Sequence, residues 1–541
     1  MFARCLRIAV TLALAGLAAA GARADWHRAD TDHFVIFSDG SARELERFAQ
    51  DTERFDALLR QFFRLPASAG GENRLTIYAV RSTDEIARLM GRGETSIAGF
   101  YRSRGEGSFA VTNRERTNTK FALSGQTTLF HEYAHHFMFR HLTAAYPAWY
   151  VEGFAEYFST VEFDKQGRWD LGKPAYHRAR SLLGNHRLDL DQLLFGTTEG
   201  MTRIEVDLYY GRAWMLVHMA MSDPEKGRQL QGYLRDFANG VEPRVAAERN
   251  FGSLDDLEET LENYVNESLR FRSSSTPLPY EGRLDIRTLS GPEGDLVDLR
   301  LERLMETDLE RTREELLELA AESPAHAGVW YELALTELAL SRSVDAADGN
   351  KEGGDGRSES EEVGDDPDAP SPQQLVHEAA ARQAIEKALA ADPQHVRARV
   401  EQVRFQMRDL TRADDLTTRS WSPLRQALLE AHRTDPRDPQ PLFVFYDSFR
   451  QTGLAAPDIA RTAIGQAFTL APESSRLRMA YVNDLVAHDE IPRAIALLKA
   501  LAYNPHGGGG ALEFLEELED HLAERTSAET GTGQQTEPTA P

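Results

Sequence analysis

Two histidines four residues apart, with a glutamate beside the first, form the segment with the clearest chemical potential. The segment is His131-Glu132-Tyr133-Ala134-His135, and residues 129–138 carry apolar side chains at helical spacing. Residues four apart lie on the same face of a helix, so His131 and His135 can direct two imidazoles at one point. Glu132 is rotated by about 100° from His131 and is placed to hold a water molecule instead of coordinating. This spacing is the HExxH pattern of a zinc site.

A catalytic zinc site needs a third protein ligand and one open position. The run WYVEGFAEY over residues 149–157 offers Glu152 and Glu156, four apart on one helical face. Pro147 is suited to the first turn of this second helix. The short stretch 141–146 would return the second helix to the side of the first. The spacing leaves both glutamates open as the third ligand.

Together, these two segments resemble the gluzincin metallopeptidases, in which HExxH is followed by a helix that carries a glutamate ligand. The run WYVEGFAEYF is similar to the peptidase-MA-like families of bacterial exported proteins, which often carry tetratricopeptide repeats. The resemblance covers roughly residues 26–270 and is specific between 131 and 158. It implies Zn²⁺ as the cofactor and a distinct role for each glutamate. The implied ligands are His131, His135 and Glu152, and Glu156 would orient the far nitrogen of one histidine.

A tyrosine further along the chain is a candidate for stabilising the reaction. Tyr210, in the segment 209–214, corresponds best to a tyrosine that faces the metal in the same family. The resemblance implies that it donates a hydrogen bond to the oxyanion of a tetrahedral intermediate. A role as an ordinary core tyrosine fits the sequence equally well. His136 and His141 lie off the face of the motif, so we expect them in solvent or at the core edge.

The resemblance implies an exported zinc metallopeptidase that cleaves peptide bonds. Zinc would polarise the scissile carbonyl and activate water, and Glu132 would move the proton. A substrate could add its backbone to the sheet beside residues 108–112. The chain has no G-x-M-E-N stretch before the motif, which favours an endopeptidase or an unknown specificity over an aminopeptidase.

Two other functions stay open. One is a repeat-based scaffold whose zinc site is vestigial or structural, and the other is a zinc hydrolase of non-peptide bonds, such as a cell-wall amide. An intact Glu132 favours an enzyme, because a structural site has no use for the base. There is no G-x-S-x-G, and the single cysteine is Cys5, so the sequence offers no serine or thiol nucleophile motif.

The chain begins with a pattern typical of secretory signal peptides. Arg4 and Arg7 precede the apolar run 8–20, and Ala22-Arg23-Ala24 is a small-x-small cleavage site. We expect residues 1–24 to be removed, with an uncleaved anchor as the alternative. The protein would then be periplasmic or secreted, with no stable membrane insertion. Its formal charge of −25 speaks against nucleic acid, so we expect no nucleic-acid partner.

The length of 541 residues calls for two or three domains. Residues 25–275 mix strands and helices, so we expect an α+β zincin-like domain with its sheet packed on one side. A linker over 276–302 would follow. The expected elements are strands over 33–37, 75–80, 97–102 and 108–112, and a helix over 42–63.

Residues 303–525 are expected to be all helical and to form repeats. Prolines at 324, 393, 436, 472 and 505 each end a helical pattern at spacings near those of the 34-residue tetratricopeptide repeat. Such repeats would form a concave surface for a protein or peptide partner. Residues 343–372 hold ten acids and two bases, so we expect a disordered acidic insertion there. A disordered tail is expected over 526–541.

Overall fold

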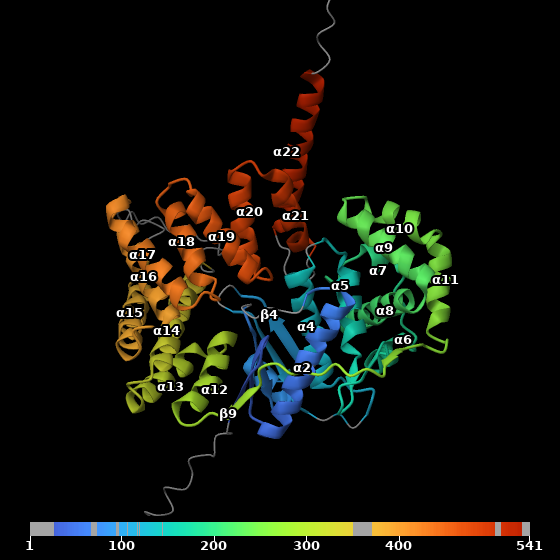
Figure 1. Ribbon diagram of the computed structural model, residues 1–541, viewed down its shortest axis with the longest axis horizontal. Helices are drawn as coiled ribbons and strands as arrows, with labels where there is room; N and C mark the ends of the chain where they lie inside the picture. The colour runs from blue at the N-terminus through green and yellow to red at the C-terminus, as the bar shows by residue number, and fades with distance from the viewer. Residues whose placement is uncertain are drawn as a thin grey trace, which may run out of the picture.

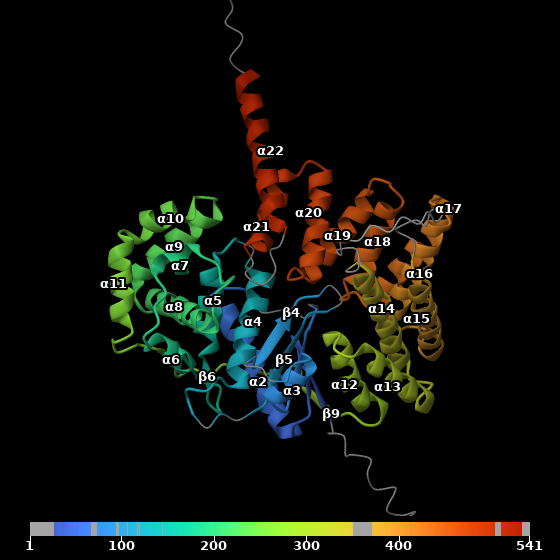
Figure 2. The ribbon, with the colours of Figure 1, turned by 180° about the vertical axis from the view of Figure 1, so that it is seen from behind.

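The computed structural model describes residues 26–66, 73–93, 97–104, 107–115, 117, 119–142, 144–349, 370–503 and 510–532. In this part of the chain the fold is α+β, with a mixed six-stranded sheet, a small three-stranded sheet and 21 α-helices. Figure 1 shows the larger sheet at the centre, between one compact helical lobe and a curved array of helices. The view from behind shows the same three-part arrangement (Figure 2).

The six-stranded sheet pairs residues 27–30 with residues 285–288, which lie far apart in the sequence. Its order is β4-β5-β3-β2-β1-β9. Neighbouring strands β2, β3 and β5 are parallel, whereas β4, β1 and β9 each pair antiparallel with their neighbours. The strands are β1 (His27–Asp30), β2 (Phe34–Ser38), β3 (Leu75–Val80), β4 (Gly99–Arg102), β5 (Phe109–Asn113) and β9 (Asp285–Thr288).

Both faces of this sheet are covered, so the expectation of a sheet packed on one side was wrong. Phe34 and Ile36 of β2 enter the core under helices α2 (Ala42–Phe62) and α4 (Gly125–His141). Phe37, on the opposite face, packs in a second core with residues of α3 (Thr83–Leu89) and α12 (Pro292–Met305). The central strands are apolar on both sides, as is typical of strands buried between two helical layers.

The compact helical lobe follows α4. Its first helix, α5 (Ala148–Ser159), packs against α4 and against α8 (Arg203–Ser222). The three-stranded sheet lies beside it. The other elements are β6 (Glu162–Phe163), β7 (Trp169–Leu171), the 3₁₀ turn η1 (Tyr176–Arg178), α6 (Ala179–Leu182), α7 (Leu190–Phe195), α9 (Pro224–Ala238), α10 (Pro243–Phe251), α11 (Leu254–Tyr264) and β8 (Arg272–Ser274).

The rest of the described chain is helical, in successive antiparallel pairs that curve around the sheet (Figure 1). Prolines 324, 393, 436 and 472 each follow the end of a helix, as expected, because proline cannot continue a helix. The helices after α12 are α13 (Leu309–Glu322), α14 (Ala327–Gly349), α15 (Pro372–Ala391), α16 (Val396–Arg412), α17 (Thr418–Thr434), α18 (Gln440–Gln451), α19 (Asp458–Leu470), α20 (Ser475–Ala487), α21 (Ile491–Ala502) and α22 (Ala511–Thr532).

Three expected boundaries differ from the structure. The stretch 276–302 is not a plain linker, since β9 joins the sheet beside β1 and α12 begins within it. The short, polar sequence of β9 shows no alternation of apolar and polar residues that would predict a strand. Its strand conformation depends on its pairing with β1. Helix α14 continues to Gly349 and α22 to Thr532, so parts of the expected insertion and tail are helical. Residues 1–25, 350–369 and 533–541 lie outside the described residues.

The C-terminal helical region contacts the C-terminal end of α4 directly. Arg140 of α4 donates to the Glu473 carboxylate at 2.9 Å, and both side chains are buried. Arg478 of α20 donates to the carbonyl of Phe139 at 3.0 Å. Ser103, after β4, donates to the backbone carbonyl of Glu473 at 2.6 Å. Among the described helices, none combines the length and apolarity needed to span a membrane.

Candidate metal centre

Helix α4 is fixed at its start to the end of strand β5. The Ser124 side chain caps the helix by accepting from the Thr127 amide at 3.0 Å. Thr112 of β5 donates to the carbonyl of Gly125 at 2.7 Å. A Cβ at Gly125 would lie 1.7 Å from the carbonyl oxygen of Asn113, so only glycine permits this close approach. The sheet therefore sets the position of the HExxH helix.

The side of α4 opposite the candidate metal site is bonded to α2. Tyr133, within the HExxH segment, donates to the buried Asp56 carboxylate at 2.6 Å. Arg60 donates to the same carboxylate at 2.7 Å. The rings of Phe55 and Phe130 stack at 4.2 Å between the two helices. These contacts fix the rotation of α4, so that His131 and His135 face α5.

Helix α5 reaches its place through a glycine that faces α8. A Cβ at Gly153 would lie 2.5 Å from the carbonyl oxygen of Ala213, so α5 and α8 pack closely there. On the α4 side, the ring of Phe154 packs on Phe63, which also contacts Phe137. This packing turns the carboxylate of Glu152 toward the two histidines.

Three donor atoms from α4 and α5 converge. The Nε2 atoms of His131 and His135 lie 3.1 Å apart, and Glu152 Oε2 lies 3.4 and 3.5 Å from them. Zinc bonds of about 2.0–2.1 Å at tetrahedral angles separate neighbouring ligand atoms by about 3.3 Å. The donor set of two imidazoles and a carboxylate therefore fits zinc in both chemistry and spacing. Glu152 is 2% exposed and His135 is 1% exposed, so the set is largely shielded from solvent.

Glu156 lies behind His131 instead of among the donor atoms. Its Oε1 is 3.2 Å from His131 Nδ1, and its Oε2 is 2.9 Å from His177 Nε2. Arg178 donates to Glu156 Oε1 at 2.5 Å and to Asp207 at 2.5 Å. Burial alone would raise the pKa of Glu156, but Arg178 and the two histidines hold this pKa well below its usual value. An ionised Glu156 that accepts from Nδ1 leaves Nε2 of His131 available as a ligand atom.

Glu152 and Glu156 both raise the pKa of His131. Burial would lower its pKa, but the hydrogen bonds and charges of Glu152 and Glu156 outweigh burial and raise the pKa to about 10. At neutral pH a proton on His131 therefore offsets part of the charge of the two buried carboxylates, in addition to the Arg178 guanidinium beside Glu156. A divalent cation would supply this positive charge in place of the proton.

Tyr210 lies beside His131, and the charge of Glu132 acts on the Tyr210 hydroxyl. Glu132 is partly exposed and follows His131 directly in the chain. The Tyr210 ring lies 6.1 Å from the His131 ring, and the Arg178 guanidinium stacks on it at 5.1 Å. The charge of Glu152, together with burial, raises the pKa of Tyr210, so its hydroxyl stays protonated and can donate.

The structure separates the other histidines of this region from the candidate site. His136 is buried and hydrogen-bonded to the Tyr101 hydroxyl at 3.0 Å, and His141 Nε2 lies 3.4 Å from a guanidinium nitrogen of Arg60. Sequence reasoning missed His177, Arg178 and Asp207. These residues have no motif spacing. Only the folding of η1 and α8 brings His177 and Arg178 to Glu156, and Asp207 to Arg178.

A second group with three possible donors lies on the far side of α4. It consists of His33, Glu53 and Asp56. The backbone amide and the ring of His33 bond to Glu53 at 2.9 and 2.7 Å, and Asp56 accepts from Arg60 and Tyr133. Since both carboxylates already accept hydrogen bonds, this group connects β2, α2 and α4 as a polar network.

The strand expected beside a substrate is not an edge strand. Strand β5 is paired on both sides, with β4 and β3. In the described residues β4 is the outer strand at this end of the sheet, and its Tyr101 contacts His136 of α4. A substrate that adds to the sheet would therefore pair with β4, and the assignment to residues 108–112 was wrong.

Neither a scan of protein-family models nor a search of curated proteins returned a match for this chain. The resemblance of residues 131–158 to gluzincin metallopeptidases stays a prediction.

Proposed function

We propose that the protein is an exported zinc-dependent peptidase of gluzincin type, with a zincin-like catalytic domain. The observation that carries this proposal is the convergence of His131, His135 and Glu152 at 3.1–3.5 Å, with Glu132 directly beside them in the chain. The buried carboxylate Glu156 behind His131 supports it further, because such partners commonly orient ligand histidines.

Each residue has a separate task in this proposal. His131, His135 and Glu152 would hold a zinc ion, which would supply Lewis acidity and lower the pKa of water. Glu132 is the base that accepts a proton from the attacking water and delivers it to the leaving nitrogen. Tyr210, which stays protonated, donates to the oxygen that gains negative charge. Strand β4 offers backbone groups for an extended peptide.

The decisive experiment compares the wild-type protein with Glu132→Gln. Both would be purified without residues 1–24, analysed for bound zinc, and incubated with a peptide library whose products are identified by mass spectrometry. We expect about one zinc per chain in both proteins, and a loss of cleavage of about 10²–10⁴-fold in the variant. Glu259→Gln, an exposed glutamate on α11, is the matched control and should cleave normally.

The possible results separate the alternatives. Unchanged cleavage by Glu132→Gln would reject this residue as the base. Bound zinc without cleavage of any peptide by the wild type would support the scaffold with a structural or vestigial site. Cleavage of cell-wall amides but not peptides would support the non-peptide hydrolase. Absence of zinc from freshly purified protein would remove the basis of the proposal.

The proposed location is the periplasm or the exterior, supported by the signal-like residues 1–24. A fusion of these residues to a reporter enzyme that is active only after export tests the location. The helical repeats are proposed to recruit a protein or peptide.

A further inference from the structure

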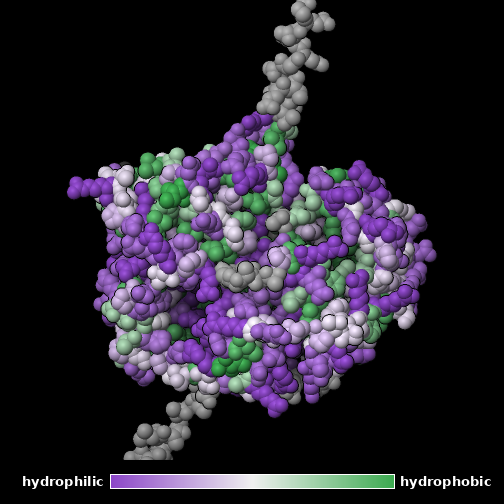
Figure 3. All heavy atoms as spheres, viewed as in Figure 1, coloured by the Kyte–Doolittle hydropathy of each residue, from purple (hydrophilic) through white to green (hydrophobic). Residues whose placement is uncertain are grey.

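A large cavity lies between the sheet and the helical repeats, on the sheet face opposite the metal centre. Its volume is about 800 Å³. The sheet contributes Val35, Phe37, Thr76, Tyr78 and Phe109, while helices α12, α14, α16, α18 and α20 supply the other walls. The space-filling view is hollowed between the repeats and the sheet (Figure 3). The metal centre and this cavity are therefore separate sites.

Arginine dominates the charge of this cavity. Among the described residues that line it are ten arginines but only three acidic residues, Glu332, Glu401 and Asp447. The whole chain, by contrast, carries a formal charge of −25. The arginines are Arg28, Arg74, Arg104, Arg300, Arg303, Arg342, Arg397, Arg404, Arg408 and Arg476.

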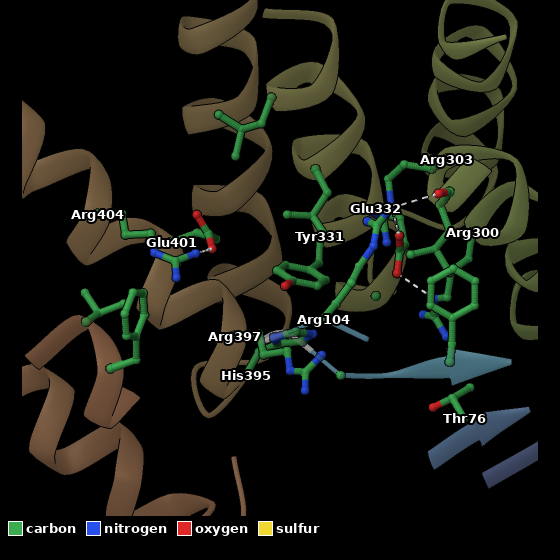
Figure 4. Close-up of a pocket in the computed structure, with 18 of the residues that line it drawn as sticks. Thr76, Arg104, Arg300, Arg303, Tyr331, Glu332, His395, Arg397, Glu401 and Arg404 are labelled. Carbon is green, nitrogen blue, oxygen red and sulfur yellow. Dashed lines mark hydrogen bonds and ion pairs between the residues drawn. The ribbon is translucent and has the colours of Figure 1, made fainter. Parts of the chain in front are cut away.

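Ion pairs with acids offset much of this positive charge, and some acids are shared between two arginines. Glu332 is shared by Arg300 and Arg303, each at 2.6 Å (Figure 4). Four acids behind the walls also pair with lining arginines. They are Asp30, Glu306, Glu378 and Asp438. Among the described residues, the ten arginines still outnumber these seven acids, so positive charge predominates on the described walls.

The arginines approach from both walls. Arg104, which follows β4, lies next to Arg397 of α16, while Arg300 and Arg303 extend from α12 (Figure 4). Arginine presents a planar fork that binds carboxylates in pairs of hydrogen bonds. Between them the walls offer apolar surface. This surface includes Val35, Phe37, Leu335, Leu338, Phe443 and Val444.

We propose that this cavity binds an acidic segment of a partner polypeptide, in which carboxylate side chains alternate with apolar ones. The predominance of positive charge matches carboxylates, and the apolar patches match the intervening side chains. The volume is within the range of sites that enclose a short ligand, so the site takes a short segment and not a duplex. The strongly negative charge of the chain also disfavours a long nucleic acid, whose phosphates would be repelled outside the cavity.

The test measures binding of a peptide to the protein that comprises residues 25–541. The probe is a fluorescein-labelled peptide of about twelve residues with the repeat Glu-Leu-Glu-Ala, and binding is followed by fluorescence polarisation. We expect saturable binding that weakens as NaCl rises from about 0.05 to about 0.5 M. The same peptide with glutamine at each glutamate position should not bind. An oligothymidylate of similar charge serves as the nucleic-acid comparison.

The variant R342Q/R408Q/R476Q removes three positive charges from the cavity. Arg342 and Arg476 are exposed, so replacing them leaves the buried Arg300–Glu332–Arg303 pairs in place. Arg408 is half-buried and pairs with the buried Glu378, which keeps Arg412 at 2.7 Å when Arg408 is replaced. We expect binding to weaken about tenfold or more. The matched control R228Q/R235Q/R249Q changes the charge equally on the exposed surface of α9 and α10 and should bind like wild type. Circular dichroism checks that both variants are folded.

Several results would overturn the proposal. Equal weakening in both triple variants would mean that net charge, and not the cavity, controls binding. Tighter binding of oligothymidylate than of the acidic peptide would assign a nucleic acid instead. If the probe binds only after removal of residues 351–369, the occupant is the acidic segment of the chain itself and not a partner. The measurement needs neither zinc nor catalysis, so it is independent of the peptidase proposal.

Discussion

Replacing Glu152 and Glu156 separately by glutamine distinguishes the two carboxylates that lie four residues apart on α5. In the structure only Glu152 lies near both Nε2 atoms, at 3.4 and 3.5 Å, whereas Glu156 contacts Nδ1 of His131 at 3.2 Å. Glu156→Gln should therefore keep three metal-binding side chains but lose the charge that orients His131. Loss of such a partner weakens metal binding about 10–100-fold, which is about 1.4–2.7 kcal/mol. Glu152→Gln removes a ligand atom and should weaken zinc binding more.

Zinc affinity would be measured by competition with a chromophoric chelator. The control is Glu162→Gln, whose exposed carboxylate pairs only with Lys173 among the described contacts. The pH dependence adds a second test. Glu156 helps to raise the pKa of His131 to about 10 in the ion-free protein, so protons compete with zinc below that pH. Removing Glu156 lessens this competition, so the loss of affinity should be larger at pH 9 than at pH 7.

The opposite order of effects would refute the reasoning. If Glu156→Gln weakened zinc binding more than Glu152→Gln did, Glu156 would be the third ligand. If neither variant differed from the control, zinc would not bind at this site.

Two further predictions concern the contact of α4 with the C-terminal helical region and the wall of the cavity. Glu473→Gln should lower the free energy of unfolding by about 3 kcal/mol, because the buried charge of Arg140 loses the carboxylate that pairs with it. Urea denaturation of this variant and of the exposed control Glu430→Gln measures the loss. A loss below about 1 kcal/mol would contradict the prediction. Glu332 is buried, which would raise its pKa, but Arg303 and Arg300 lower this pKa from 4.5 to about 2. Its ionised form therefore stabilises the fold by about 3 kcal/mol above pH 4.5, and this contribution is lost as the pH falls toward 2. Urea midpoints of wild type and Glu332→Gln should thus differ most at neutral pH and converge near pH 2, whereas a constant difference would disprove the assignment.

The sequence by itself was sufficient where the relevant geometry is local. The spacing of His131 and His135 places both imidazoles on one face because the helical period is fixed. The apolar runs of β2 and β3 predicted strands, and the prolines after α13, α15, α17 and α19 marked helix ends correctly. These features depend only on a residue and its near neighbours.

The tertiary structure decided which of two equivalent carboxylates faces the imidazoles. Glu152 and Glu156 share a helical face, so only the packing of α5 against α4 and α8, through Gly153 and Phe154, sets which one reaches them. The partners of Glu156 and the arginines of the cavity come from segments far apart in the chain. Strand β9 likewise exists only because β1 pairs with it. Sequence spacing determines distances within one helix or strand, whereas the distances between such elements depend on how the whole core packs.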